Sequence, residues 1–202
     1  MKRRRGLRLI TQTHDIIHST GFLDLARKLP KYFTRKRKMD FVDVMTMLLN
    51  FLSKSLRMEL DEYFDRTDLL GRITKQAFSK ARQKIRFEAF QFLYQQGVEL
   101  IMSETDQFHL WKGFRLYAID GTEIYVEPTK ENIEFFGQKK KRDNCKAKVS
   151  VLMEVFDRFT VHAGIGRYDK GERVFASEHI EYLEQFRTKK DLIIRLSGTN
   201  GT

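Results

Sequence analysis

In the stretch Leu116-Tyr117-Ala118-Ile119-Asp120-Gly121-Thr122, a lone carboxylate, that of Asp120, directly follows four apolar residues. An ionised group at such a position costs free energy unless something nearby needs its charge. The flanking segment, residues 114–126, is rich in aromatic and β-branched residues and has the length of a half-buried hairpin. The pattern therefore predicts that Asp120 lies at the end of a strand, a natural position for a metal ligand.

Asp120 also has a purely structural interpretation. The dipeptide Asp120-Gly121 is common in hairpin turns, where the carboxylate bonds the backbone of the turn itself. Periodicity alone does not choose between a turn residue and a metal ligand.

The chain downstream has the pattern of a mixed α/β unit. Apolar runs of strand length continue, with Asp157-Arg158 predicted as a tight turn between two of them. Residues 172–186 have helical spacing, and residues 191–194 have the composition of a buried strand that would lie beside the first. With the hairpin of residues 114–126 counted once, the predicted order is strand, strand, strand, helix, strand. The predicted strand runs are 114–119, 123–126, 149–156, 159–165 and 191–194.

The chain before residue 107 is predicted to be helical throughout. From Asp40, the expected N-cap, apolar residues recur at three- and four-residue spacing. The helical rhythm resumes at Leu56 and is predicted to end at Leu69-Leu70-Gly71, with the glycine just past the last turn. Residues 87–102 form a further amphipathic segment, whose aromatic side chains are expected to pack in the core.

Positive charge is concentrated in the first part of the chain. Residues 1–90 hold 21 Lys or Arg against 10 Asp or Glu, whereas residues 91–202 hold 17 of each, so the net charge of +11 belongs to the first part. Such segregation indicates a module that meets a polyanion, joined to a second module with a different role. Nucleic acid is the leading partner and an anionic membrane surface the second. Solubility alone remains the alternative explanation.

Thr74 is predicted to cap a short, strongly basic helix. One face of the segment is apolar and the rest is cationic. With the preceding helix and a tight turn containing Gly71, it fits a helix-turn-helix-like DNA-binding unit. Many solvated helices have the same pattern, so an exposed helix without DNA contacts is the alternative. The candidate DNA-binding residues are Lys75, Lys80, Arg82, Lys84 and Arg86.

Several other functions have little support in the sequence. The five histidines are scattered, with no metal-ligand spacing, no Ser-His-Asp order and no Gly-rich phosphate loop. These patterns argue against zinc chemistry, a catalytic triad and a nucleotide-driven enzyme. One cysteine, Cys145, cannot form an internal disulfide, and the apolar runs are too short to span a bilayer. We therefore expect a protein of a reducing cytoplasm with no membrane partner.

Four stretches carry a family resemblance: TKQAFSKARQKI (74–85), LYAIDGT (116–122), VSVL (149–152) with its hairpin, and GERVFASEHI (171–180). They resemble the DDE transposases of bacterial insertion sequences, of the insertion-sequence-four type. The resemblance covers most of residues 40–194, and the segment Ala118-Ile119-Asp120-Gly121-Thr122 is its most specific part.

The resemblance implies a helical DNA-binding region over residues 1–106 and the first part of an RNase H-like α/β core over residues 107–194. In that core, two Asp and one Glu hold two divalent metals, usually Mg²⁺, which drive phosphodiester hydrolysis and strand transfer. Asp120 aligns with the first acid, so its implied role is catalytic and metal-binding. The implied partners are double-stranded DNA at element ends, a second copy of the chain, or an intact transposase.

The chain departs from the family after residue 194. The family's corresponding strand leads into an Asp-Arg-Gly-Tyr-like motif with the second acid, whereas Arg195-Leu196-Ser197-Gly198 follows here. The expectation is a truncated, catalytically incomplete transposase, with an irregular tail over residues 195–202. The alternatives are a non-catalytic DNA-binding protein that represses or titrates an intact transposase, and a basic protein unrelated to DNA.

Overall fold

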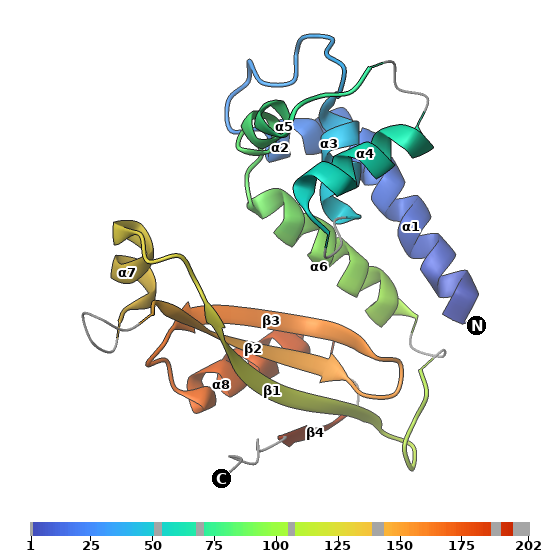
Figure 1. Cartoon of the computed structure of the whole chain (residues 1–202). Coiled ribbons are helices and arrows are strands. Elements are labelled where there is room, and N and C mark those ends of the chain that lie inside the picture. The colour runs from blue at the N-terminus through green and yellow to red at the C-terminus, as the bar shows by residue number, and fades with distance from the viewer. Residues whose placement is uncertain are drawn as a thin grey trace. The chain divides into compact units, whose positions relative to one another are not determined.

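The computed structural model describes residues 2–50, 54–67, 71–104, 108–138, 144–186 and 191–195, and for residues 2–4 and 191–195 the backbone alone. The chain divides into two compact units, Met1–Ser103 and Glu104–Thr202 (Figure 1). The first unit is helical and the second combines helices with a sheet, so the molecule belongs to the mixed α and α/β class.

The described residues of the first unit form six helices around one apolar core. Phe78 is completely buried, and Phe22 contacts Phe41 and Phe92 with ring centres 5.9 Å apart in each pair. All six helices contribute buried side chains to one apolar cluster, so none lies independently on the surface. The helices are α1 (Lys2–His18), α2 (Thr20–Ala26), α3 (Phe41–Leu49), α4 (Leu56–Arg66), α5 (Lys75–Arg82) and α6 (Glu88–Ser103).

The predicted helix starts at Asp40 and Thr74 are confirmed. Asp40 caps α3 through a reciprocal capping box with Asp43, and the Thr74 hydroxyl accepts from the Ala77 amide at the start of α5. The predicted end of α4 at Gly71 is wrong. The helix ends at Arg66, where Thr67 turns extended and its hydroxyl donates to the carbonyl of Tyr63. That side-chain bond satisfies a carbonyl of the last turn.

Helix α5 also ends earlier than predicted, because the residues after it pair with backbone groups of residues 26–28. Ile85 forms an antiparallel bridge with Arg27. The Lys28 amide donates to the Lys84 carbonyl at 2.8 Å, and the Arg86 amide donates to the Ala26 carbonyl at 2.7 Å. Lys84 and Arg86 therefore lie beyond the helix, in the turn and bridge formed by residues 83–86, which we call the bridge segment. Their predicted helical placement is wrong.

The second unit contains one four-stranded sheet in the order β3-β2-β1-β4 (Figure 1). Strand β2 pairs antiparallel with both β1 and β3, and β4 pairs parallel with β1. The predicted place of residues 191–194 beside the first strand is thus confirmed. The elements are β1 (Arg115–Tyr125), α7 (Lys130–Phe136), β2 (Lys146–Glu154), β3 (Phe159–Arg167), α8 (Glu172–Glu184) and β4 (Asp191–Arg195).

The predicted hairpin around Asp120-Gly121 is wrong, because β1 is one continuous strand of 11 residues. Asp120 pairs with Val151 and Gly121 with Ser150, so β2 supplies hydrogen-bonding partners on both sides of the dipeptide. A type I′ turn requires positive φ at both central residues. Neither residue adopts it. The ladder with β2 overrides the local turn propensity.

Helix α8 covers one face of this sheet, behind β2 in the view of Figure 1. Glycine allows its close approach, since a Cβ on Gly164 would lie only 3.0 Å from Cδ1 of the buried Phe175. Side chains alternate between faces along a strand. Ser150 contacts His179 of α8 and pairs with Gly121, so the Gly121 position of β1 faces α8. Asp120 is the preceding residue of the strand, so its side chain points to the opposite face.

The link between β2 and β3 lies where the sequence predicted a tight turn, but it is longer. Residues 155–158 connect the strands, and Arg158 takes a left-handed conformation with φ of 58°. The predicted irregular tail begins at Arg195, which instead belongs to β4. The rest of that prediction, residues 196–202, lies outside the described residues.

Candidate functional site

Asp120 stands where the buried half of β1 gives way to an exposed half. Tyr117, Ala118 and Ile119 are buried, whereas Asp120 and the residues after it in the strand are exposed. One oxygen of the carboxylate, Oδ1, accepts from the Gly121 amide at 2.8 Å. The carboxylate is therefore open to solvent and lightly held, which suits a ligand better than a structural anchor.

Strand β4 runs alongside this position. In the parallel register Arg195 lies opposite Ile119, so β4 ends one step before the level of Asp120. Because β2 flanks β1 on its other side, Asp120 lies on an interior strand of the sheet. Within the residues that the structure describes, no group of three or more His, Cys, Asp or Glu side chains is arranged to hold a metal ion.

A buried polar chain supports β1 from the α8 side. The Ser150 hydroxyl donates to the backbone carbonyl of Asp120 at 3.3 Å. The same hydroxyl lies 2.9 Å from Nε2 of His179, and Nδ1 of His179 lies 2.8 Å from Nδ1 of His162. The His162 ring stacks on Tyr182 with centres 4.4 Å apart. Strands β1, β2 and β3 are thereby linked to α8 beneath Asp120.

This chain of contacts fixes the protonation of both histidines. Because the Ser150 hydroxyl donates to Asp120, Nε2–H of His179 donates to Ser150, which leaves Nδ1 of His179 as an acceptor for Nδ1–H of His162. Burial, and then the neighbouring His162, lowers the pKa of His179 to about 4. Burial also lowers the pKa of His162. Both rings are therefore neutral at physiological pH.

This network is not evident in the sequence, because the histidines are scattered along the chain. His179 lies on the core face of α8 between Phe175 and Leu183, and all three side chains are buried. A polar residue at an apolar helical position is a usable signal that it has a buried partner. The partners, Ser150 and His162, are too distant in sequence for that signal to identify.

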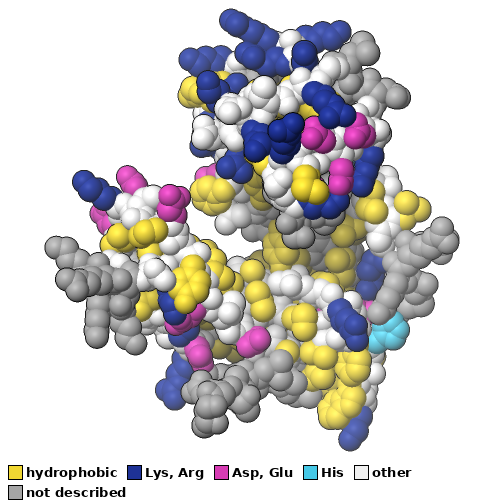
Figure 2. All heavy atoms as spheres, in the orientation of Figure 1, with side chains coloured by type: hydrophobic (Ala, Val, Ile, Leu, Met, Phe, Trp, Pro, Cys, Tyr) yellow, Lys and Arg dark blue, Asp and Glu magenta, His cyan; other side chains and the backbone are white. Residues whose placement is uncertain are grey.

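The five candidate DNA-binding residues are divided between α5 and the bridge segment. Lys75, Lys80 and Arg82 are exposed on α5, and Arg86 is exposed on the bridge segment. Lys84 is half-buried, with Nζ 5.5 Å from the centre of the Tyr32 ring. The bridge also brings Lys28 next to Lys84 through a backbone hydrogen bond. The sequence does not indicate this neighbour, because the two residues lie far apart along the chain. Figure 2 shows Lys and Arg side chains gathered over the upper end of this unit, where Figure 1 has the connection between α2 and α3, with α2 and α5 below it.

These cations differ in their partners from the cations around α4. Arg72 pairs with Asp61 at 2.9 Å and with Asp65 at 2.6 Å, and Arg66 pairs with Glu62 at 3.4 Å. Within the described part of the chain, none of the five candidates forms an ion pair with an acid. Their charge is therefore available to an external anion, whereas much of the charge around α4 is neutralised within the unit.

The predicted tight turn of a helix-turn-helix unit is wrong. Helix α4 ends at Arg66 and α5 begins at Lys75, so residues 67–74 separate the two helices. Gly71 does adopt a positive φ of 84°, but within this longer connection. The basic surface therefore rests on α5 and the bridge segment, without the compact two-helix geometry that the sequence suggested.

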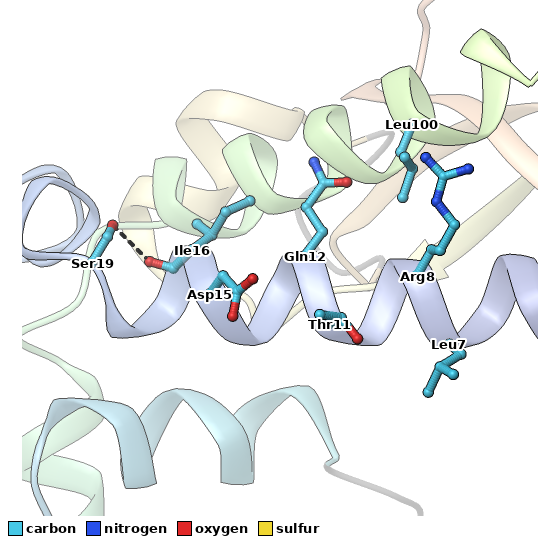
Figure 3. Close-up of a pocket in the computed structure, with 8 residues that line it drawn as sticks. All are labelled: Leu7, Arg8, Thr11, Gln12, Asp15, Ile16, Ser19 and Leu100. Atoms are coloured by element: carbon cyan, nitrogen blue, oxygen red, sulfur yellow. Dashed lines mark hydrogen bonds between the residues drawn. The ribbon is translucent and has the colours of Figure 1, made fainter.

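An open groove of about 640 Å³ lies along α1, with Leu100 of α6 on its far side (Figure 3). Its lining mixes apolar and polar side chains and includes none of the predicted site residues. The lining residues are Leu7, Arg8, Thr11, Gln12, Asp15, Ile16, Ser19 and Leu100.

Comparison with known proteins gives no relative. No protein-family model matches the chain, and no curated protein or solved structure is detectably similar to it. None of the helices in the described residues has the length and apolar character needed to cross a membrane.

Proposed function

We propose that this chain is a transposase-type DNA-binding protein, in which Asp120 is the first metal-ligating acid of an RNase H-like core. The observation that carries the proposal is the parallel pairing of β4 with β1, which ends one step before Asp120. The family resemblance implies that the strand corresponding to β4 leads directly into the second acid. The register supports an arrangement in which that position is adjacent to Asp120.

Two-metal chemistry requires the first and second acids to lie close together. Divalent metals in such sites lie a few ångströms apart, so the carboxylates that would hold them must also lie close together. When bound, Mg²⁺ would polarise the phosphodiester and activate water or a 3′-hydroxyl as the nucleophile. The exposed Asp120 carboxylate fits one ligand position, but the described residues do not supply a complete metal site. We therefore expect no cleavage or joining of DNA by this chain alone.

The first unit supports the DNA-binding half of the proposal. Lys75, Lys80 and Arg82 are exposed on α5, and none forms an ion pair with an acid in the described part of the chain. Cations of this kind bind phosphates and release counterions, which makes binding sensitive to salt. The same cations support a second candidate function, a non-catalytic protein that competes with an intact transposase for DNA, because binding through them does not require Asp120.

The test is the binding of the full chain to a labelled DNA duplex, measured by fluorescence anisotropy at a series of salt concentrations. We expect the triple variant Lys75→Gln, Lys80→Gln, Arg82→Gln to bind the duplex more weakly. The slope of log affinity against log salt concentration should become less steep by about 2 to 3. The matched control is Arg57→Gln with Arg66→Gln, which removes cations that pair with acids on α4. Absence of binding at moderate salt, or equal losses in both variants, would refute the proposal.

A further inference from the structure

Four large apolar side chains are exposed together at one end of the sheet. Leu110, Trp111 and Phe114 are 45%, 43% and 42% exposed, and Phe156 is 39% exposed. They come from two segments, residues 108–114 before β1 and residues 155–158 between β2 and β3. We call this surface the aromatic end. It contains the single tryptophan of the chain.

Trp111 and Phe114 flank a two-residue hairpin turn. Each amide donates to the other's carbonyl, at 2.8 Å from Trp111 and 2.9 Å from Phe114. Between them, Lys112 and Gly113 adopt φ values of 50° and 85°, which matches a type I′ turn. Directly paired residues place their side chains on the same side of a hairpin. The turn therefore presents both aromatic rings in one direction.

The base of this hairpin is fixed to the rest of the unit. Both the backbone amide and the ring Nδ1 of His109 donate to the carboxylate of Asp157, at 3.1 and 2.7 Å. The Asp157 side chain is only 2% exposed. The Val155 amide also donates to the Leu116 carbonyl at 2.9 Å, which ties the two segments together. Rings on an anchored base lose little conformational freedom when a ligand binds.

The exposed charges in these two segments are cationic. Lys112 lies at the hairpin tip with Nζ 4.9 Å from the centre of the Trp111 ring, and Arg158 is exposed in the neighbouring segment. Asp157, the one acid of the two segments, is buried against His109. The surface thus combines π-faces with positive charge.

We infer that the aromatic end binds single-stranded nucleic acid, with unpaired bases stacking on Trp111 and Phe114 and phosphates near Lys112 and Arg158. Every base has a π-face, and stacking on aromatic side chains beside cations is the usual means of holding single strands. Cations at the hairpin tip itself suit a polymer that alternates bases and phosphates. A lipid surface, by contrast, separates its charged layer from its apolar layer. The inference rests on the proposed DNA-binding function and adds DNA with unpaired bases as its substrate.

The single tryptophan makes this binding directly measurable. The full chain is titrated with a 15-nucleotide thymidine single strand and with a blunt duplex of the same length, while Trp111 emission is followed. We expect the single strand to quench the emission. In anisotropy with a labelled single strand, Trp111→Ala is expected to bind about tenfold more weakly, and Trp111→Phe to retain most of the affinity. Duplex binding should be unchanged in both variants.

Phe135→Ala is the matched control, because this ring is 65% exposed on α7 of the same unit. The inference is overturned if the single strand leaves Trp111 emission unchanged and Trp111→Ala binds it as the wild type does. Duplex binding that persists in that case leaves the proposed function standing. A blue shift of Trp111 emission with phosphatidylglycerol vesicles, without any response to the single strand, also overturns it in favour of a lipid surface.

Discussion

His179 shows at the scale of one residue how a buried polar group becomes sensitive to pH. The ring is completely buried, its Nε2–H donates to Ser150, and its Nδ1 accepts from His162. Protonation of Nδ1 would place two N–H groups face to face. Burial and the nearby His162 accordingly lower the pKa of His179, while Glu178 acts in the opposite direction and Lys170 in the same one.

Stability of the second unit should therefore fall in mild acid. The pKa of His179 is about 4 in the folded state against 6.5 in a model peptide, so the unfolded chain binds more protons between these values. The stabilisation is present above pH 6.5 and is lost as the pH falls toward 4. We expect a loss of about 2 kcal/mol between pH 7.5 and 5, measured by urea unfolding with Trp111 fluorescence.

Glu154 acts in the opposite direction. Burial raises the pKa of its carboxyl, so its contribution is complete at low pH and is lost as the pH rises through the folded pKa. The variant His179→Gln removes the contribution of this histidine, so the free energy of unfolding should depend less on pH. His18→Gln, an exposed histidine on α1, should leave it unchanged. An unfolding midpoint equal at pH 7.5 and 5 would show that the buried network does not titrate in this way.

Asp120 should contribute to function rather than to stability. Its carboxylate is exposed and accepts a hydrogen bond from the adjacent Gly121 amide. We expect Asp120→Asn to change the free energy of unfolding by less than about 0.5 kcal/mol. The purified wild-type chain should not nick insertion-sequence end DNA. Magnesium-dependent nicking that disappears in Asp120→Asn would contradict this and point to a complete metal site.

At the scale of elements, local signals were reliable wherever one segment alone determines the structure. The apolar periodicity of α3, α6 and α8 and the caps at Asp40 and Thr74 depend on neighbours within a few residues. The position of β4 beside β1 was also predictable, because a buried strand after a crossover helix pairs in parallel near the strand that began the unit.

The wrong predictions share a different cause. The continuation of β1 through Asp120-Gly121 depends on pairing with β2, some 30 residues away. The early end of α5 depends on the bridge between Ile85 and Arg27. The role of Asp157 as the anchor of His109, rather than a simple turn residue, depends on a contact across 48 positions. Local propensity carries no information about such partners.

The packing of α8 on the sheet gives a prediction at this scale. A Cβ on Gly164 would lie 3.0 Å from Cδ1 of Phe175, and Phe175 is only 1% exposed, so the ring has little space to move. Gly164→Ala should destabilise the second unit by about 1 to 3 kcal/mol. Gly121→Ala is the matched control in the same sheet, because its Cβ would meet the Val149 carbonyl at an ordinary 3.5 Å. Equal stability of both variants in urea unfolding would show that α8 moves freely.

At the scale of the whole molecule, the two units have separate cores. The main apolar cluster draws its buried residues from Ile17 to Leu93, all in the first unit, with Val44 completely buried. In the second unit Leu152 is completely buried between β1 and β3 on the face that α8 covers. Proteins with distinct cores need not unfold in one cooperative step.

Substitutions in one core should therefore leave the other unit's transition unchanged. Trp111 fluorescence reports the second unit, whereas the far-ultraviolet helical signal comes mainly from the helices of the first. Val44→Ala should lower the urea midpoint of the helical signal and leave that of Trp111 unchanged. Leu152→Ala should do the reverse, with losses of about 2 to 4 kcal/mol for removing a fully buried leucine. If both variants shift both signals together, the two units unfold as one cooperative body and their stabilities are energetically coupled.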